Sequence, residues 1–138
     1  MKLVDATRVR NNLASYVDDA QADEDAYAIQ SRGRIDSVLL SPASWRRGCD
    51  AEAGVPVDAD FVQRAPLGTL RENFSAYRKA ADKSGIHTLI TRHDDKRVDP
   101  DKAVAAVIAP YAWVRSALGD LGEPVLDEDS QQRYRRRG

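Results

Sequence analysis

Two stretches of the chain share one pattern of apolar positions. The apolar residues recur every three or four positions in each stretch, at Val9, Leu13, Val17 and Ala20, and again at Leu70, Phe74, Tyr77 and Ala81. Residues with this spacing lie on one face of a helix. Both stretches therefore predict an amphipathic helix, with Thr7 at the N-cap of the first and Gly68 in the matching place of the second.

Each predicted helix is followed by two short runs typical of strands. The runs are residues 27–31 and 37–41 in the first half of the chain, and residues 87–92 and 103–109 in the second. The turn Arg32-Gly33-Arg34 joins the first pair, and a longer polar connection joins the second. Leu3-Val4 predicts an edge strand before the first helix, and Phe61-Val62 a weaker counterpart. Pro42 and Pro110 each suit the first turn of a further helix, which carries a tryptophan.

The two halves also share sequence, in three blocks that follow the same order. RNNLASY at 10–16 matches RENFSAY at 71–77, IQSR at 29–32 matches LITR at 89–92, and VLLSPASW at 38–45 matches AVIAPYAW at 106–113. The second copy has extra residues around 94–102. This ordered set predicts an internal duplication.

The expected organisation is two modules of the order β-α-β-β-α. They cover residues 1–47 and 61–117, with an acidic linker at 48–60 and a polar, mobile tail at 118–138. Modules of about fifty residues bury too little surface to be stable alone, so the two are expected to pack on one another. The predicted fold class is therefore α+β, with two tandem modules packed as a pseudo-dimer.

This order of elements resembles the Phd/YefM antitoxin family. The residues that carry the resemblance are Thr7, Arg10, Asn12, Leu13, Ile29, Arg32, Gly33, residues 38–41 and Trp45. It covers residues 1–47 well and 66–117 more loosely. The resemblance implies a module that dimerises and binds palindromic operators of its own operon, with a C-terminal extension that folds onto a toxin. Here a second module takes the place of that extension, which favours a sequence-specific repressor acting on a pseudo-palindromic site.

Arginines are the candidate DNA-binding residues, because their fork of donors suits guanine edges and phosphate. The resemblance places Arg10 and Arg32 at the DNA, together with their neighbours Arg8 and Arg34. In the second copy the candidates are Arg71, Arg92, Lys96 and Arg97. The alternative is that these are ordinary solvated side chains. Residues 66–116 hold nine Lys or Arg against six Asp or Glu, whereas residues 1–47 hold seven of each.

Composition and reactive residues argue against an enzyme. The chain has 138 residues and a formal net charge of -1, and its 42% hydrophobic and 31% charged content is typical of a soluble globular protein. Its one cysteine, Cys49, excludes an internal disulfide and favours a cytoplasmic location. His87 and His93 lack the spacing of a zinc site, and neither a catalytic carboxylate pair nor a phosphate-binding glycine loop is present. No catalytic residue, metal, cofactor or membrane span is expected.

Several alternatives stay open from the sequence. Trp45 and Trp113 fit core or interface positions better than base-stacking ones. Asn12 and Asn73 either bond to the backbone within the module or contact DNA. Two other functions compete with repression: a toxin-neutralising module with little DNA affinity, whose tail orders on its partner, and a DNA-associated assembly protein. The partners expected are double-stranded DNA, a toxin protein, and a second copy of the chain in a homodimer or higher oligomer.

Overall fold

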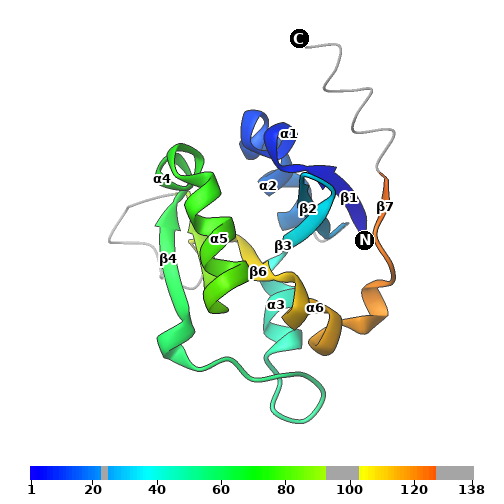
Figure 1. Ribbon diagram of the computed structural model, residues 1–138. Helices are drawn as coiled ribbons and strands as arrows, with labels where there is room; N and C mark the ends of the chain where they lie inside the picture. Colours follow the sequence, from blue (N-terminus) through cyan, green and yellow to red (C-terminus); the bar gives the residue numbers. More distant parts are fainter. Residues whose placement is uncertain (23–24, 93–102, 127–138) are drawn as a thin grey trace.

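The apolar stripes and strand-like runs form the elements of a mixed α and β structure. It is a computed structural model that describes residues 1–22, 25–92 and 103–126 (Figure 1). The elements of residues 1–48, called here the first half, are β1 (Lys2–Asp5), α1 (Ala6–Asn11), α2 (Leu13–Gln21), β2 (Tyr27–Ser31), β3 (Arg34–Leu40) and α3 (Pro42–Gly48). Those of residues 62–117, the second half, are β4 (Val62–Pro66), α4 (Leu67–Glu72), α5 (Phe74–Ser84), β5 (His87–Thr91), β6 (Val104–Pro110) and α6 (Tyr111–Ala117). Two 3-10 turns, η1 (Ala59–Phe61) and η2 (Gly119–Leu121), and a short strand, β7 (Val125–Leu126), complete the described chain.

All seven strands belong to one sheet, in the order β4-β5-β6-β3-β2-β1-β7. The pairs β1–β2, β4–β5 and β1–β7 are parallel, and the pairs β2–β3, β5–β6 and β3–β6 are antiparallel. The predicted α+β class is confirmed. The two halves meet at the centre of the sheet, where β3 pairs with β6.

Strand pairing shows which residues of the halves correspond. Tyr27 lies opposite Leu39 in the first half, as Thr88 lies opposite Ile108 in the second. Both hairpins carry a bulge, directly after Ile29 in one and directly after Ile90 in the other. A residue from 2 to 31 therefore corresponds to the residue 61 positions later (Tyr27 to Thr88), and a residue from 35 to 48 to the one 69 positions later (Leu39 to Ile108). We call such pairs counterparts.

The junction of the halves follows the same correspondence. In the β3–β6 ladder, Leu39 pairs with Ile108, its own counterpart. On either side, Val38 pairs with Ala109 and Leu40 with Val107. A local two-fold axis through the Leu39–Ile108 pair therefore exchanges β3 with β6. The same operation exchanges the outer strands, because the sheet order reads β4-β5-β6 on one side of the axis and β3-β2-β1 on the other.

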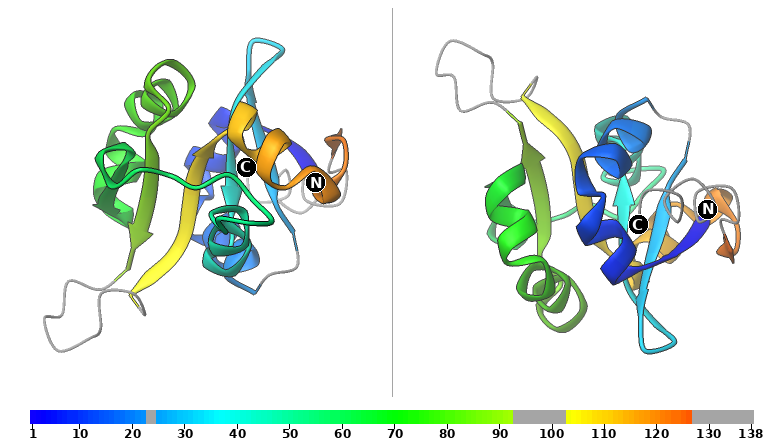
Figure 2. Two further views of the ribbon diagram at one scale, coloured as in Figure 1. Left: turned by 90° about the horizontal axis from the view of Figure 1, so that it is seen from below. Right: turned by 90° about the horizontal axis from the view of Figure 1, so that it is seen from above.

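The helices form a layer on each face of the sheet. The predicted helical stripes pack with Val4, Ile29, Leu39 and Ile108 into one core, which α1, α2, α4 and α5 cover. The opposite face packs against α3 and α6, around Val38, Leu40, Val107 and Val114. In Figure 1, α3 and α6 lie below the sheet and α1, α2 and α4 above it; Figure 2 views the molecule from these two sides.

Each predicted long helix is broken at an asparagine. Asn12 separates α1 from α2 with φ −129° and ψ 33°, and its counterpart Asn73 separates α4 from α5 with φ −121° and ψ 31°. The Asn12 Nδ2 donates to the carbonyl of Arg8 at 3.0 Å, and the Asn73 Nδ2 donates to that of Thr69 at 3.2 Å. The same two carbonyls also accept the backbone N–H of Asn12 and of Asn73, so each asparagine closes the last turn of the helix before it. Of the two roles open from the sequence, the structure shows the backbone bond.

The start of the predicted tail is part of the fold. Leu118 is buried, and the N-terminal amine of Met1 donates to the carbonyl of Leu121 at 2.7 Å. β7 then pairs with β1, with Val125 N donating to the carbonyl of Met1 at 2.9 Å. Residues 118–126 thus form η2 and β7 where a mobile segment was expected, and β1 is covered where an edge strand was expected. The remaining tail lies outside the described residues.

Candidate nucleic-acid interface

Arg10 and Arg71 occupy corresponding places in the two halves. They are counterparts by strand register as well as by sequence, and both are exposed on the short helices α1 and α4. Within the described part of the chain, neither side chain makes an ion pair. Both helices lie on the same face of the sheet, so the local two-fold axis relates two exposed guanidinium groups. This is the only pair among the predicted DNA-binding arginines that the described residues place as counterparts.

Arg8 differs from its counterpart. It is half-buried on α1, and the matching residue of α4 is Thr69. The first half therefore has one more cation beside the exposed arginine than the second half. The two ends of any surface formed by α1 and α4 are chemically unequal.

Arg32 lies at the tip of the first hairpin. It forms a two-residue turn with Gly33, and both have a positive φ, 54° and 77°. This is the requirement of a type I′ turn, whose twist matches that of the strands it joins. A glycine tolerates that conformation, but a long side chain such as arginine adopts it at a cost. Arg32 is exposed, and among the described residues no hydrogen bond or ion pair of its side chain offsets this cost.

The variant Arg32→Asn is therefore expected to stabilise the fold. Asn-Gly is a favoured pair for this turn, and the expected gain is about 0.5–1 kcal/mol in the free energy of unfolding. Urea denaturation of both proteins measures it, with Arg10→Asn as a control in which no left-handed residue is relieved. A loss of stability in Arg32→Asn would show that the arginine makes a contact worth more than the strain.

Arg34 links the two halves. Its guanidinium group donates to both carboxylate oxygens of Asp82 on α5, at 2.6 and 2.8 Å. This hydrogen bonding lowers the pKa of Asp82 and raises that of Arg34. The Arg34 side chain is 65% exposed, so solvent screens the pair. Arg34 is committed to a partner within the chain, which the sequence did not indicate.

Arg92 makes a similar link in the opposite direction. It forms an ion pair with Asp18 on α2 at 2.8 Å and donates to the carbonyl of Ala14 at 3.1 Å. Its counterpart by strand register is Ser31, so matching it to Arg32 on sequence displaced the second hairpin by one residue. The same offset makes His93 the counterpart of Arg32. His93, Lys96 and Arg97 all lie outside the described residues.

Trp45 and Trp113 meet around one buried histidine. The Trp45 Nε1 donates to Nδ1 of His87 at 2.9 Å, and the indole of Trp113 meets the imidazole edge to face at 4.7 Å. The Trp113 Nε1 donates to the carbonyl of Val55 at 2.9 Å. Both indoles thus contact neighbouring elements of the fold, as the core or interface interpretation expects. They are not counterparts, because strand register matches Trp45 with Val114 and Trp113 with Ser44.

Other residues with reactive side chains are dispersed. The half-buried thiol of Cys49 has a raised pKa because burial disfavours its thiolate, which makes it a poor nucleophile. Over residues 1–22, 25–92 and 103–126, no three His, Cys, Asp or Glu side chains gather as metal ligands. Nor is any helix of these residues long and apolar enough for a membrane span.

Comparisons of the chain with known protein families, with curated proteins and with solved structures find no match. The functional assignment therefore depends on the arrangement of the residues themselves.

Proposed function

We propose that this chain is a non-enzymatic, double-stranded-DNA-binding protein built from two fused Phd/YefM-like modules, a single-chain equivalent of a symmetric dimer. The observation that carries the proposal is the relation between Arg10 and Arg71. They are counterparts across the Leu39–Ile108 axis, and both are exposed and without an ion pair among the described residues. Duplex DNA has local two-fold axes of its own, so a pseudo-symmetric pair of cations suits two half-sites.

The differences between the halves define the expected target. Arg8 accompanies Arg10, whereas Thr69 accompanies Arg71. Arginine is the commonest reader of guanine and also binds phosphate. The proposed target is therefore an imperfect palindrome, and the protein is proposed to repress transcription where such a site overlaps a promoter.

Covalent fusion supports this mechanism physically. In a dimer of separate modules, the second half binds only at sufficient protein concentration. In the fused chain the second half is always present, at a high effective concentration. Occupancy of the site then depends on the concentration of one chain and not on its square.

The proposal is tested by selecting bound duplexes from random DNA and measuring affinity for the selected site. Replacing both Arg10 and Arg71 with alanine is expected to weaken binding at least about 30-fold, because each arginine that binds DNA contributes about 1–3 kcal/mol. The slope of log affinity against log salt concentration should become shallower by about two, because each arginine removed leaves one phosphate without its cation.

The chain offers a matched control for this experiment. Arg46 on α3 and Arg115 on α6 are also exposed counterparts, but they lie on the opposite face of the sheet. The double variant Arg46→Ala, Arg115→Ala makes the same change in charge and should keep its affinity. Equal losses of affinity in both double variants would show that net charge alone, and not the position of Arg10 and Arg71, accounts for the effect. Recovery of no preferred duplex would overturn the proposed function.

A further inference from the structure

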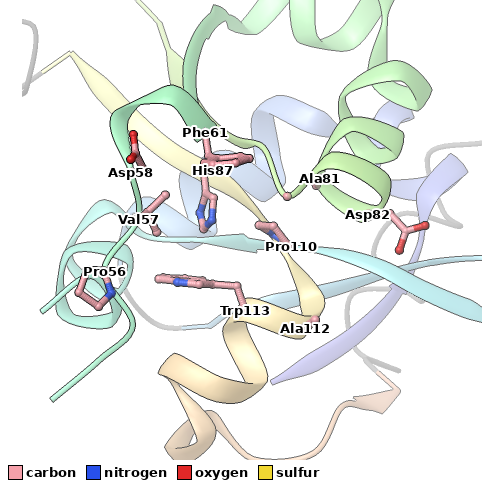
Figure 3. A pocket seen from close by; sticks show the side chains of 11 residues that line it. Pro56, Val57, Asp58, Phe61, Ala81, Asp82, His87, Pro110, Ala112 and Trp113 are labelled. Atoms are coloured by element: carbon pink, nitrogen blue, oxygen red, sulfur yellow. The ribbon is translucent and has the colours of Figure 1, made fainter. Parts of the chain in front are cut away.

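A pocket of about 480 Å³ opens between the linker and the second half (Figure 3). Its walls come from residues 56–58 of the linker, from Phe61 just after it, from the end of α5, from β5 and from the start of α6. Most of the lining is apolar, including Val57, Pro110 and Trp113. Ligand pockets in proteins usually have volumes of roughly 300–1,000 Å³, with apolar walls and a few placed polar groups. This pocket has both properties.

The placed polar group is the imidazole of His87. The side chain lines the pocket and is only 2% exposed. Burial lowers its pKa to about 4, so the ring is neutral near neutral pH. Its Nδ1 accepts the Trp45 Nε1–H, which leaves the proton on Nε2. No group among the described residues bonds to Nε2, so the histidine has a donor available for a ligand.

The charge of Asp58 at the pocket disfavours anions. Asp58 and Asp82 both line it, but the Asp82 carboxylate is paired with Arg34 through both oxygens, so its charge is largely compensated. A carboxylate or phosphate on a ligand would meet the like charge of Asp58. A neutral ring would instead pack against the indole of Trp113 and the exposed ring of Phe61.

The corresponding place in the first half is built differently. The counterparts of His87 and Trp113 are Ala26 and Ser44, which are small and carry no ring. There Met1 and Leu121 pack against the core that includes Ala26. The two halves otherwise share strand register, bulges and helix breaks. Both the aromatic wall and the buried donor are therefore features of the second half alone, where they meet in one cavity.

We propose that this pocket is a binding site for a planar, uncharged nitrogen heterocycle of two fused rings, whose ring nitrogen accepts the Nε2–H of His87 while its face packs on Trp113. The pocket has ample room for a bicyclic compound, and the neutral donor fits an acceptor nitrogen without charge. This inference does not depend on DNA binding by the other face of the sheet.

Quinoline is the probe that tests it, because it has two fused rings and one acceptor nitrogen. Titrated into the nitrogen-15-labelled full chain near neutral pH, it is expected to shift the indole N–H resonance of Trp113 saturably. Indole has a similar shape but no ring acceptor and should bind roughly fivefold more weakly, the usual value of one hydrogen bond. The anion 2-naphthoate should bind most weakly of the three.

Two variants locate the site. Ala112→Phe fills the pocket from an exposed position on α6 and should weaken quinoline binding at least tenfold. Its matched control is Ala43→Phe, since Ala43 is the exposed counterpart on α3 and is expected to leave binding unchanged. His87→Asn keeps an acceptor near the Trp45 Nε1–H but lacks Nε2, so it should remove the preference for quinoline over indole.

Each outcome either supports or overturns the assignment. Absence of a saturable shift, or equal losses in Ala112→Phe and Ala43→Phe, would overturn the site itself. Equal affinity for quinoline and indole in the wild-type chain would overturn the role of His87 and reduce the pocket to an apolar surface. Strongest binding by 2-naphthoate would overturn the expected exclusion of anions.

Discussion

Replacing Asp36 with alanine is expected to lower the free energy of unfolding by about 3 kcal/mol, because it leaves the charge of Arg78 unpaired in a nearly buried place. The Asp36 carboxylate on β3 binds Nη1 of Arg78 on α5 at 2.5 Å, and the two side chains are only 13% and 12% exposed. Asp36 also accepts the hydroxyl of Ser37 at 2.8 Å. The pair joins the first half to the second, so its loss weakens the packing between the halves. Urea denaturation measures the effect.

Two further variants separate this cause from a general loss of charge. Asp36→Leu combined with Arg78→Met removes both charges and keeps the volume, and it should recover most of the stability. Asp82→Ala also breaks an ion pair between the halves, but the partner Arg34 is well exposed and can be hydrated instead. Its effect should be clearly smaller. Similar losses in Asp36→Ala and Asp82→Ala would contradict the importance assigned to burial.

The sequence predicted the elements well because they follow from local patterns, although the N-caps are Asp5 and Pro66 and not Thr7 and Gly68. Apolar spacing located the helices whose buried stripe includes Val9 and Leu70, and both stripes enter the same core. Alternation and turn residues located the hairpins, and Ser41 with Pro42 forms the cap and first turn of α3 as Pro42 suggested. These features depend on residues within a few positions of one another.

The correspondence of the halves was predicted one residue out of place in two blocks. Matching Arg32 with Arg92, and Trp45 with Trp113, gave the most identities. The register of the ladders, continued beyond the paired residues, instead matches Ser31 with Arg92 and Trp45 with Val114. Side chains alternate between the two faces of a strand, so a shift of one residue exchanges those faces. Burial and pairing decide the register, and chemical identity at an exposed hairpin end does not.

The remaining differences involve residues distant in sequence. Arg34 and Arg92 appeared as free surface arginines because Asp82 and Asp18 lie far along the chain. The linker appeared featureless, yet it forms η1 and a wall of the pocket. Only the packing of the halves brings these residues together. Within the candidate interface, the local sequence match correctly paired only Arg10 with Arg71 among the described residues.

Acid should weaken the fold before its carboxylates titrate, and His87 is the expected cause. Its pKa falls from an ordinary 6.5 to about 4 in the folded chain, because burial disfavours the charged ring. Between these values the unfolded chain binds a proton that the folded chain does not. The associated stability is fully present above pH 6.5 and is lost as the pH falls toward 4. The total is on the order of 3 kcal/mol, from about 1.4 kcal/mol for each pKa unit.

His87→Asn isolates this contribution, because asparagine can accept the Trp45 Nε1–H and does not titrate in this range. The variant will be less stable than the wild type near neutral pH if its smaller side chain leaves a void. The quantity to compare is therefore the slope of stability against pH. Urea denaturation at several pH values gives this slope. Between pH 6.5 and 4 the free energy of unfolding of the wild type should change more steeply than that of the variant, by up to about 1.4 kcal/mol per pH unit, the value for one proton. Parallel curves, or an imidazole resonance that titrates near 6.5 in the folded chain, would show that the ring is hydrated and that the buried Trp45–His87 bond does not form.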